Sequence, residues 1–314
     1  MSVKFYGLLV PPLPGEAAIN LRGGADPLDI YLRCAATCRA SFAHWGYDWT
    51  LATNEVERLA ERCRAIGLDD IPLREVSFEW SVPEDIRFRS AHYKLELMHR
   101  FASGEFGDRV ALVDLDAVCA RAMPDEAMKS GGLIGYDMSA VAQRGEQAQE
   151  VIDSLRMLGF KTEEARWWGG EFILGDGDHF KALSRQLLQK WPVYTARIAD
   201  MAHVGDEMVL TSGLEALRLQ GMKVADGGTM GVVARYWSAR TRTPFPPFRD
   251  VGTASVWHLP ADKPFLARWA TRHFDPATFR KEYRAMLRGK VWLRRCLVLT
   301  DKLRGRPRLF APQI

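Results

Sequence analysis

Residues 109–118, Arg-Val-Ala-Leu-Val-Asp-Leu-Asp-Ala-Val, form the stretch that decides the fold. The four apolar residues from Val110 to Val113 predict a strand that is buried on both faces. Asp114 and Asp116 follow where this strand should end. Ligands of α/β sheets bind beyond the carboxyl ends of strands, and alternation along an extended chain would direct both carboxylates to one side. The pair therefore predicts a site for Mg²⁺ or Mn²⁺, with the phosphates of a substrate as further ligands.

The chain on either side of this stretch alternates between strand and helix patterns. Strands are expected over residues 3–10, 47–53, 74–78, 132–136, 171–174, 223–225 and 255–258. Helices are expected over residues 31–42, 55–66, 90–101, 179–190 and 205–219. The regular alternation up to residue 118 predicts an α/β fold, in which a mostly parallel sheet with right-handed crossovers is flanked by helices.

Composition indicates a globular protein that stays in the cytoplasm. Of the 314 residues, 47% are hydrophobic and 26% are charged, as is usual for globular chains. No run approaches the ~18 apolar residues of a membrane span, and the first residues do not resemble a signal peptide. The five cysteines are an odd number without zinc-finger spacing, which favours reduced thiols.

The net charge of +4 is unevenly distributed along the chain. Residues 280–308 hold eleven Lys and Arg but only two acidic residues, Glu282 and Asp301, which gives +9. The remaining 32 basic and 37 acidic residues give −5. The basicity therefore belongs to one end of the chain. We expect a catalytic domain over residues 1–272 and a basic helical tail over residues 273–314.

The tail has the pattern of a basic amphipathic helix. One side gathers basic residues, namely Arg280, Arg284, Arg288, Arg295 and Lys302. An adjoining apolar stripe contains Ala285, Trp292, Cys296, Leu299 and Leu303. Such a helix suits the surface of an anionic membrane, and a helix packed on the body with a solvated basic face is the alternative. No known nucleic-acid-binding motif accompanies the charge, so nucleic acid is not expected as a partner.

Further motifs surround the two aspartates along the chain. They are Tyr93-Lys94-Leu95, Gly169-Gly170-Glu171, Gly205-Asp206-Glu207, and His258 followed by Lys263-Pro264-Phe265. Glycine allows close approach of the backbone to a ligand, or simply a tight bend. A core histidine, a solvated lysine and a helix cap are the corresponding structural explanations for His258, Lys94 and Asp206. Each motif is weak alone, and their order carries the information.

In this order the motifs resemble those of nucleotide-sugar glycosyltransferases of the GT-A fold. The resemblance is strongest to the glycogenin and lipopolysaccharide galactosyltransferase family, and it covers roughly residues 3–270. It implies transfer of a sugar from a nucleotide-diphosphate donor to a glycan or glycolipid acceptor, in polysaccharide or lipopolysaccharide biosynthesis. A peripheral position on the inner face of a membrane would suit such an acceptor.

The resemblance also implies roles for individual residues. Mn²⁺, or Mg²⁺, would be held by Asp114, Asp116 and His258, and would neutralise the charge on the departing diphosphate. Binding of the donor nucleotide sugar would involve Asp114 and Asp116 together with Lys94, Gly169, Gly170 and Lys263. The carboxylates that we expect to take part in catalysis, as base, nucleophile or sugar-hydroxyl contact, are Glu171, Asp206 and Glu207.

Two other functions fit parts of the pattern. In a haloacid-dehalogenase-type phosphatase, Asp114 would be the nucleophile, Asp116 the acid or base, and Gly205-Asp206 the last motif. However, about 110 residues precede the first motif, which in that family usually lies on the first strand. That function also leaves His258 and Lys263 without a role. The second is a non-catalytic domain that binds nucleotide sugars, for which metal-dependent binding without turnover would be diagnostic.

Overall fold

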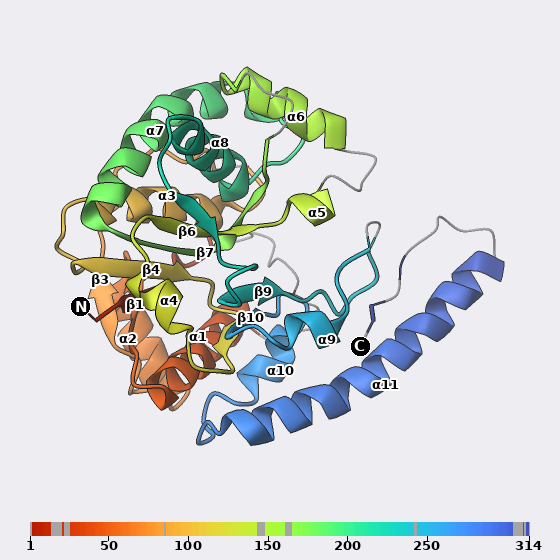
Figure 1. The fold of residues 1–314 in the computed structure, drawn as a ribbon. Helices are drawn as coiled ribbons and strands as arrows, with labels where there is room; N and C mark the ends of the chain where they lie inside the picture. The colour runs from red at the N-terminus through yellow and green to blue at the C-terminus, as the bar shows by residue number, and fades with distance from the viewer. Residues whose placement is uncertain are drawn as a thin grey trace.

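The computed structural model describes residues 2–13, 21, 26–84, 86–142, 148–160, 165–241, 244–303, 310 and 312–313, with only the backbone at 142, 148 and 299–303. Within this part, a seven-stranded sheet flanked by helices confirms the predicted fold class (Figure 1). In spatial order its strands are β3 (Leu73–Glu75), β2 (Asp48–Thr53), β1 (Lys4–Leu8), β4 (Arg109–Val113), β7 (Trp168–Asp176), β6 (Leu133–Asp137) and β8 (Val224–Asp226).

The sheet is mostly parallel, with one reversed strand. The pairs β3–β2, β2–β1, β1–β4 and β6–β8 are parallel, whereas β7 runs antiparallel to both β4 and β6. The alternation of strands and helices did not predict this reversal. Its consequence is that the carboxyl end of β4 lies beside the first residues of β7, where the Gly-Gly-Glu motif is found.

Helices cover both faces of the sheet and form two cores. The helices α3 (Arg89–Phe101), α7 (Gly177–Ala196) and α8 (Asp206–Leu219) contribute to one cluster, and α1 (Pro27–His44) and α2 (Val56–Ala65) to the other. Strand β4 lies between the two clusters. Val110 and Leu112 belong to the first and Ala111 and Val113 to the second, so the strand is buried on both faces, as its apolar run predicted.

A second, three-stranded sheet was not predicted in full. It consists of β5 (Ala117–Cys119), β10 (Val256–His258) and β9 (Val233–Arg235), and only β10 was expected from the sequence. The two missed strands have three residues each, too few to establish a period. In the register of the parallel pair β9–β10, Arg235 lies next to His258. The short sheet therefore fixes His258 beside the chain that leaves β4.

Short helices complete the connections. They are α4 (Asp125–Lys129), α5 (Ser139–Ala142), α6 (Ala148–Met157), the 3₁₀ turn Ile198–Asp200, α9 (Phe248–Val251) and α10 (Lys263–Ala267). No helix of the described residues is long and apolar enough to cross a bilayer.

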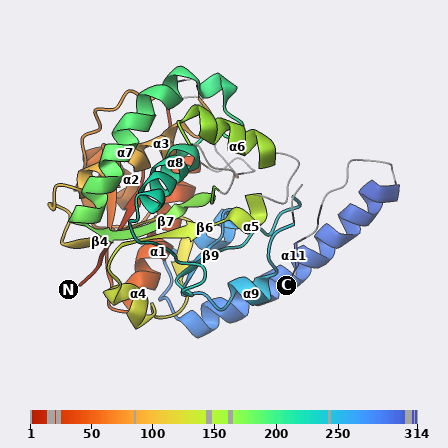
Figure 2. The same cartoon turned by 45° about the horizontal axis from the view of Figure 1, so that its top comes forward.

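Most of the described tail is one long helix, α11 (Pro276–Leu303), which runs along the edge of the molecule in Figure 1 and Figure 2. Its inner face is a four-residue repeat of buried side chains, Phe279, Tyr283, Leu287 and Val291, the first three of which belong to the α1–α2 core. This stripe differs from the expected one, since Trp292 is 69% exposed. Of the other predicted positions, the side chains of Leu299, Lys302 and Leu303 lie outside the described residues.

Candidate active site

A cavity of about 430 Å³ opens beyond the carboxyl ends of β1 and β4. Its walls come from the end of β1, the turn after β4, the first residues of α3 and α8, and the segment that follows β10. Of the residues selected from the sequence, those that line it are Lys94, Asp114, Asp116, Asp206, Glu207, His258 and Lys263. Gly169, Gly170 and Glu171 lie behind this wall. The cavity therefore lies at the carboxyl ends of strands, which is where α/β sheets bind their ligands.

Asp114 and Asp116 lie on a tight turn rather than on an extended strand. The backbone N–H of Asp114 donates to the carbonyl of Glu171 at 3.0 Å, and that of Ala117 donates to the carbonyl of Asp114 at 3.2 Å. The chain then continues into β5. The two carboxylates therefore converge because the chain turns between them, and not through the alternation that the sequence suggested.

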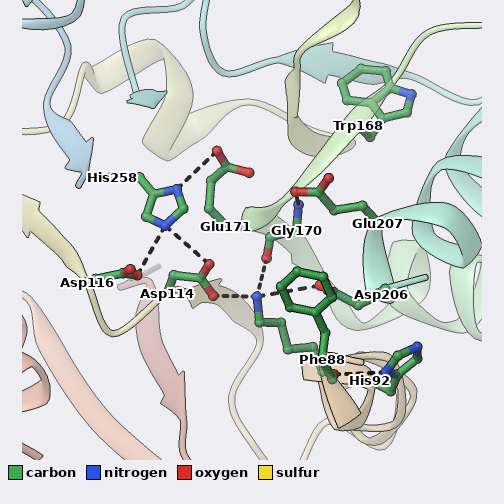
Figure 3. A network of polar contacts seen from close by, with 12 residues as sticks. Phe88, His92, Asp114, Asp116, Trp168, Gly170, Glu171, Asp206, Glu207 and His258 are labelled. Carbon is green, nitrogen blue, oxygen red and sulfur yellow. Dashed lines mark hydrogen bonds and ion pairs between the residues drawn. The ribbon is translucent and has the colours of Figure 1, made fainter. Parts of the chain in front are cut away.

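Three side chains converge at this turn: Asp114, Asp116 and His258 (Figure 3). The Nε2 atom of His258 lies 3.1 Å from Oδ1 of Asp116 and 3.5 Å from Oδ2 of Asp114. Each aspartate directs its other oxygen to a lysine: Asp114 Oδ1 lies 2.5 Å from Nζ of Lys94, and Asp116 Oδ2 lies 2.6 Å from Nζ of Lys263. One oxygen of each carboxylate and one imidazole nitrogen are thereby directed at a common point.

The electrostatics of this cluster favour positive charge at its centre. Burial would lower the pKa of His258, but Asp116 and Glu171 outweigh it and raise the pKa to about 9. Burial would raise the pKa of Asp116, yet Lys263 and His258 hold it well below its usual value. The three ligand atoms lie within 4.8 Å of one another, and two carboxylates with one imidazole are a donor set that suits Mn²⁺. The residues present therefore fit the expected cation.

Lys94 connects the aspartate turn to the start of α8. Besides Asp114, its ammonium group donates to the carbonyl of Gly170 at 3.1 Å and lies 3.5 Å from Oδ2 of Asp206. Asp206 is 6% exposed, and among the described residues its buried Oδ2 has this ion pair but no hydrogen bond. Because Asp206 lines the cavity, its carboxylate could accept from a hydroxyl group of a substrate.

Gly169 and Gly170 do not form the tight bend that was one explanation of the motif. Both lie inside β7 and neither has a positive φ, so they form no bend. A Cβ on Gly169 would lie 2.0 Å from Oε2 of Glu171, and a Cβ on Gly170 would lie 2.1 Å from Oδ2 of Asp206. The two glycines thus make room for two carboxylates of the protein.

Arg235 is a residue of the site that sequence reasoning missed, because β9 was not recognised as a strand. It lines the cavity and pairs with both oxygens of Glu171, at 2.6 and 2.7 Å, and with Oε1 of Glu207 at 2.5 Å. Burial would raise the pKa of Glu207, but Arg235 more than compensates and lowers it. Glu207 also accepts from the indole N–H of Trp167 at 3.2 Å. The carboxylate is therefore ionised and held in one orientation.

Aromatic side chains on the cavity wall were also missed. Phe88, at the N-terminus of α3, has a φ of 60°, and its ring stacks on His203 with centroids 6.2 Å apart. A left-handed conformation is strained for a bulky residue, and such strain is concentrated at functional sites. Trp237 lines the same cavity. A phenylalanine in a left-handed conformation has no sequence signature, so only the structure reveals this wall.

Comparisons with known proteins give only distant likenesses. No protein-family model matches the sequence. No curated protein sequence matches it either. Among solved structures, the fold is similar to that of galactosyltransferase LgtC in complex with donor and acceptor sugar analogs, with a TM-score of 0.48 and 13% identity over 88% of this chain and 99% of that chain. An active-site mutant of LgtC gives a TM-score of 0.45 and 13% identity over 82% and 86% of the two chains.

Proposed function

We propose that this chain is a metal-dependent glycosyltransferase that moves a sugar from a nucleotide-diphosphate donor to a glycan or glycolipid acceptor. The observation that carries the proposal is the convergence of Asp114, Asp116 and His258 at the mouth of a cavity that also presents Lys94 and Lys263. The motifs that resemble the GT-A family are thus neighbours in space.

The cation side of the site would bind the diphosphate. When bound, Mn²⁺ or Mg²⁺ supplies positive charge that stabilises the departing nucleoside diphosphate. Asp114, Asp116 and His258 would hold the ion, and the ammonium groups of Lys94 and Lys263 would add charge on the phosphates. Each lysine is paired with one of the two aspartates, so both ammonium groups lie beside the proposed cation site.

The opposite side of the cavity would bind and activate the sugars. Asp206 lines the cavity beside Lys94, and its carboxylate would accept from a sugar hydroxyl. Glu207 is ionised, lines the cavity, and is our candidate for the nucleophile or base. Glu171 does not line the cavity, which favours Glu207 over Glu171 for direct contact with a substrate.

The phosphatase alternative is less well supported. In that alternative His258 and Lys263 have no task, yet both contact Asp116, at 3.1 and 2.6 Å. Asp114, which would be the phosphatase nucleophile, is paired with Lys94 and faces His258. These contacts are those of a shared cation and phosphate site rather than of a free nucleophile.

Turnover of candidate substrates separates the alternatives. With Mn²⁺ present, we expect slow hydrolysis of at least one nucleotide sugar in the absence of acceptor, and no turnover of a generic phosphomonoester. Rapid phosphomonoester hydrolysis with a phosphorylated Asp114 would instead identify a phosphatase. Metal-dependent binding of nucleoside diphosphates without turnover of any nucleotide sugar would identify the non-catalytic domain.

We also propose that the tail, residues 273–314, attaches the catalytic domain, residues 1–272, to the surface of an anionic membrane. The outer face of α11 carries exposed Lys281, Arg284, Arg288 and Arg295 around exposed Trp292. Basic residues attract anionic lipid, and an interfacial tryptophan adds burial. A glycolipid acceptor would then be available at high local concentration.

A further inference from the structure

Glu171 is a carboxylate that lies away from the cavity surface. Its side chain is fully buried and does not line the cavity. A buried carboxylate of this kind is tolerated only when it is paired and hydrogen-bonded. Its partners therefore indicate what it does.

The partners of Glu171 lead to the metal ligand. Its Oε1 lies 3.3 Å from Nδ1 of His258, while Nε2 of the same ring faces Asp116 and Asp114. When Nδ1 donates its proton to Glu171, the lone pair of Nε2 is directed at the cation site. A carboxylate behind a histidine fixes the tautomer and the ring orientation of a metal ligand.

Arg235 holds this carboxylate in place. Its Nε and Nη2 contact the two oxygens of Glu171 at 2.6 and 2.7 Å, the forked geometry in which arginine fixes a carboxylate. Because Arg235 and His258 are register neighbours on β9 and β10, the short sheet sets their relative position. Arg235 also contacts Glu207 on the cavity wall, so one guanidinium connects the cation side of the site with the sugar side.

We propose that Glu171 and Arg235 are positioning residues for the metal ligand His258: Glu171 accepts the Nδ1 proton, which leaves Nε2 to bind the cation, and Arg235 orients Glu171. This inference rests on the proposed function, since it assumes a cation at Asp114, Asp116 and His258. It assigns Glu171 a role through His258 rather than a direct role in catalysis.

The test measures Mn²⁺ affinity of the full chain directly, by titration of the EPR signal of free Mn²⁺ without nucleotide. Glu171→Gln keeps the size of the side chain but removes the charge that accepts the Nδ1 proton, so we expect about 10- to 100-fold weaker Mn²⁺ binding. Glu215→Gln is the matched control, because Glu215 is also fully buried and paired with an arginine, Arg218, but its other contacts are to Arg166 and Trp168 rather than to His258. We expect its Mn²⁺ affinity to stay within about twofold of the parent chain.

The outcomes separate the two proposals. If Glu171→Gln binds Mn²⁺ as tightly as the parent chain, the positioning role is wrong while the metal site stands. If both glutamine variants lose affinity in parallel with thermal stability, the role of Glu171 is merely structural, and the inference is again overturned. Should Glu171→Gln not fold, Glu171→Asp keeps the charge but withdraws it from Nδ1, and the same loss is expected. Absence of Mn²⁺ binding by the parent chain would overturn the metal site itself.

Discussion

At the scale of single residues, the site depends on two positions at which only glycine, which has no Cβ atom, leaves enough space. Gly169 and Gly170 leave space for Glu171 and Asp206, whose oxygens would lie 2.0 and 2.1 Å from an added Cβ. Contacts this short force the carboxylates to move. Since Glu171 is held by Arg235 and Asp206 lies beside Lys94, neither can move without breaking an ion pair.

We therefore expect different defects from alanine at the two positions. Gly170→Ala should displace Asp206 and raise the KM for the nucleotide sugar at least about tenfold, with Mn²⁺ affinity unchanged. Gly169→Ala should displace Glu171, weaken Mn²⁺ binding, and lower the free energy of unfolding by about 1–3 kcal/mol. Gly177→Ala is the control, because its Cβ would meet nothing within 4 Å. Unchanged kinetics and metal affinity in both β7 variants would refute this account of the Gly-Gly pair.

At the scale of elements, the sequence predicts the long, periodic helices and strands and misses strands of only three residues. The apolar run of β4 was sufficient to predict a strand buried on both faces, and the two aspartates after it were sufficient to select two members of the Asp114, Asp116 and His258 cluster. Strand β9 has only three residues, and Arg235 on it belongs to the site only because β9 pairs with β10. Pairing between distant segments leaves no local pattern, so Arg235 could not be selected from the sequence.

Helix α11 is joined to the site through one buried acid. Asp262, which is 2% exposed and directly precedes Lys263, accepts from the hydroxyl of Tyr283 at 2.7 Å and lies 2.5 Å from Nζ of Lys290. Removing one partner of a buried ion pair costs about 3–5 kcal/mol. Lys290→Met should therefore lower the free energy of unfolding by about 3 kcal/mol in urea denaturation. Lys281→Met, on the exposed face of the same helix, should change it by less than about 0.5 kcal/mol. Equal effects of the two would contradict this role of Asp262.

At the scale of the whole molecule, α11 carries a row of exposed basic residues on its outer face. Because the inner face of the helix packs into the α1–α2 core, the membrane proposal is best tested by substitution rather than by truncation. Glutamine at Lys281, Arg284, Arg288 and Arg295 removes four charges, each worth about 1 kcal/mol near an anionic surface. We expect the variant to lose most of its binding to anionic liposomes.

The matched control removes four exposed basic residues elsewhere, namely Arg58, Arg64, Lys129 and Lys181. Its net charge is the same as that of the α11 variant, so a general effect of charge would weaken both equally. Binding of the parent chain should also fall as salt is raised, because exposed charges are screened. Equal partitioning of both variants onto anionic liposomes would show that the outer face of α11 is not a membrane surface.

If Asp114 and Asp116 hold a cation that binds a nucleoside diphosphate, calorimetric titration measures that binding directly. A panel of nucleoside diphosphates is titrated with and without Mn²⁺ into the parent chain and into the double variant Asp114→Asn, Asp116→Asn. The parent chain should bind at least one of them far more tightly with Mn²⁺, and the double variant, folded by circular dichroism, should lose that metal-dependent part. Metal-dependent affinity that persists unchanged in the double variant would contradict the account.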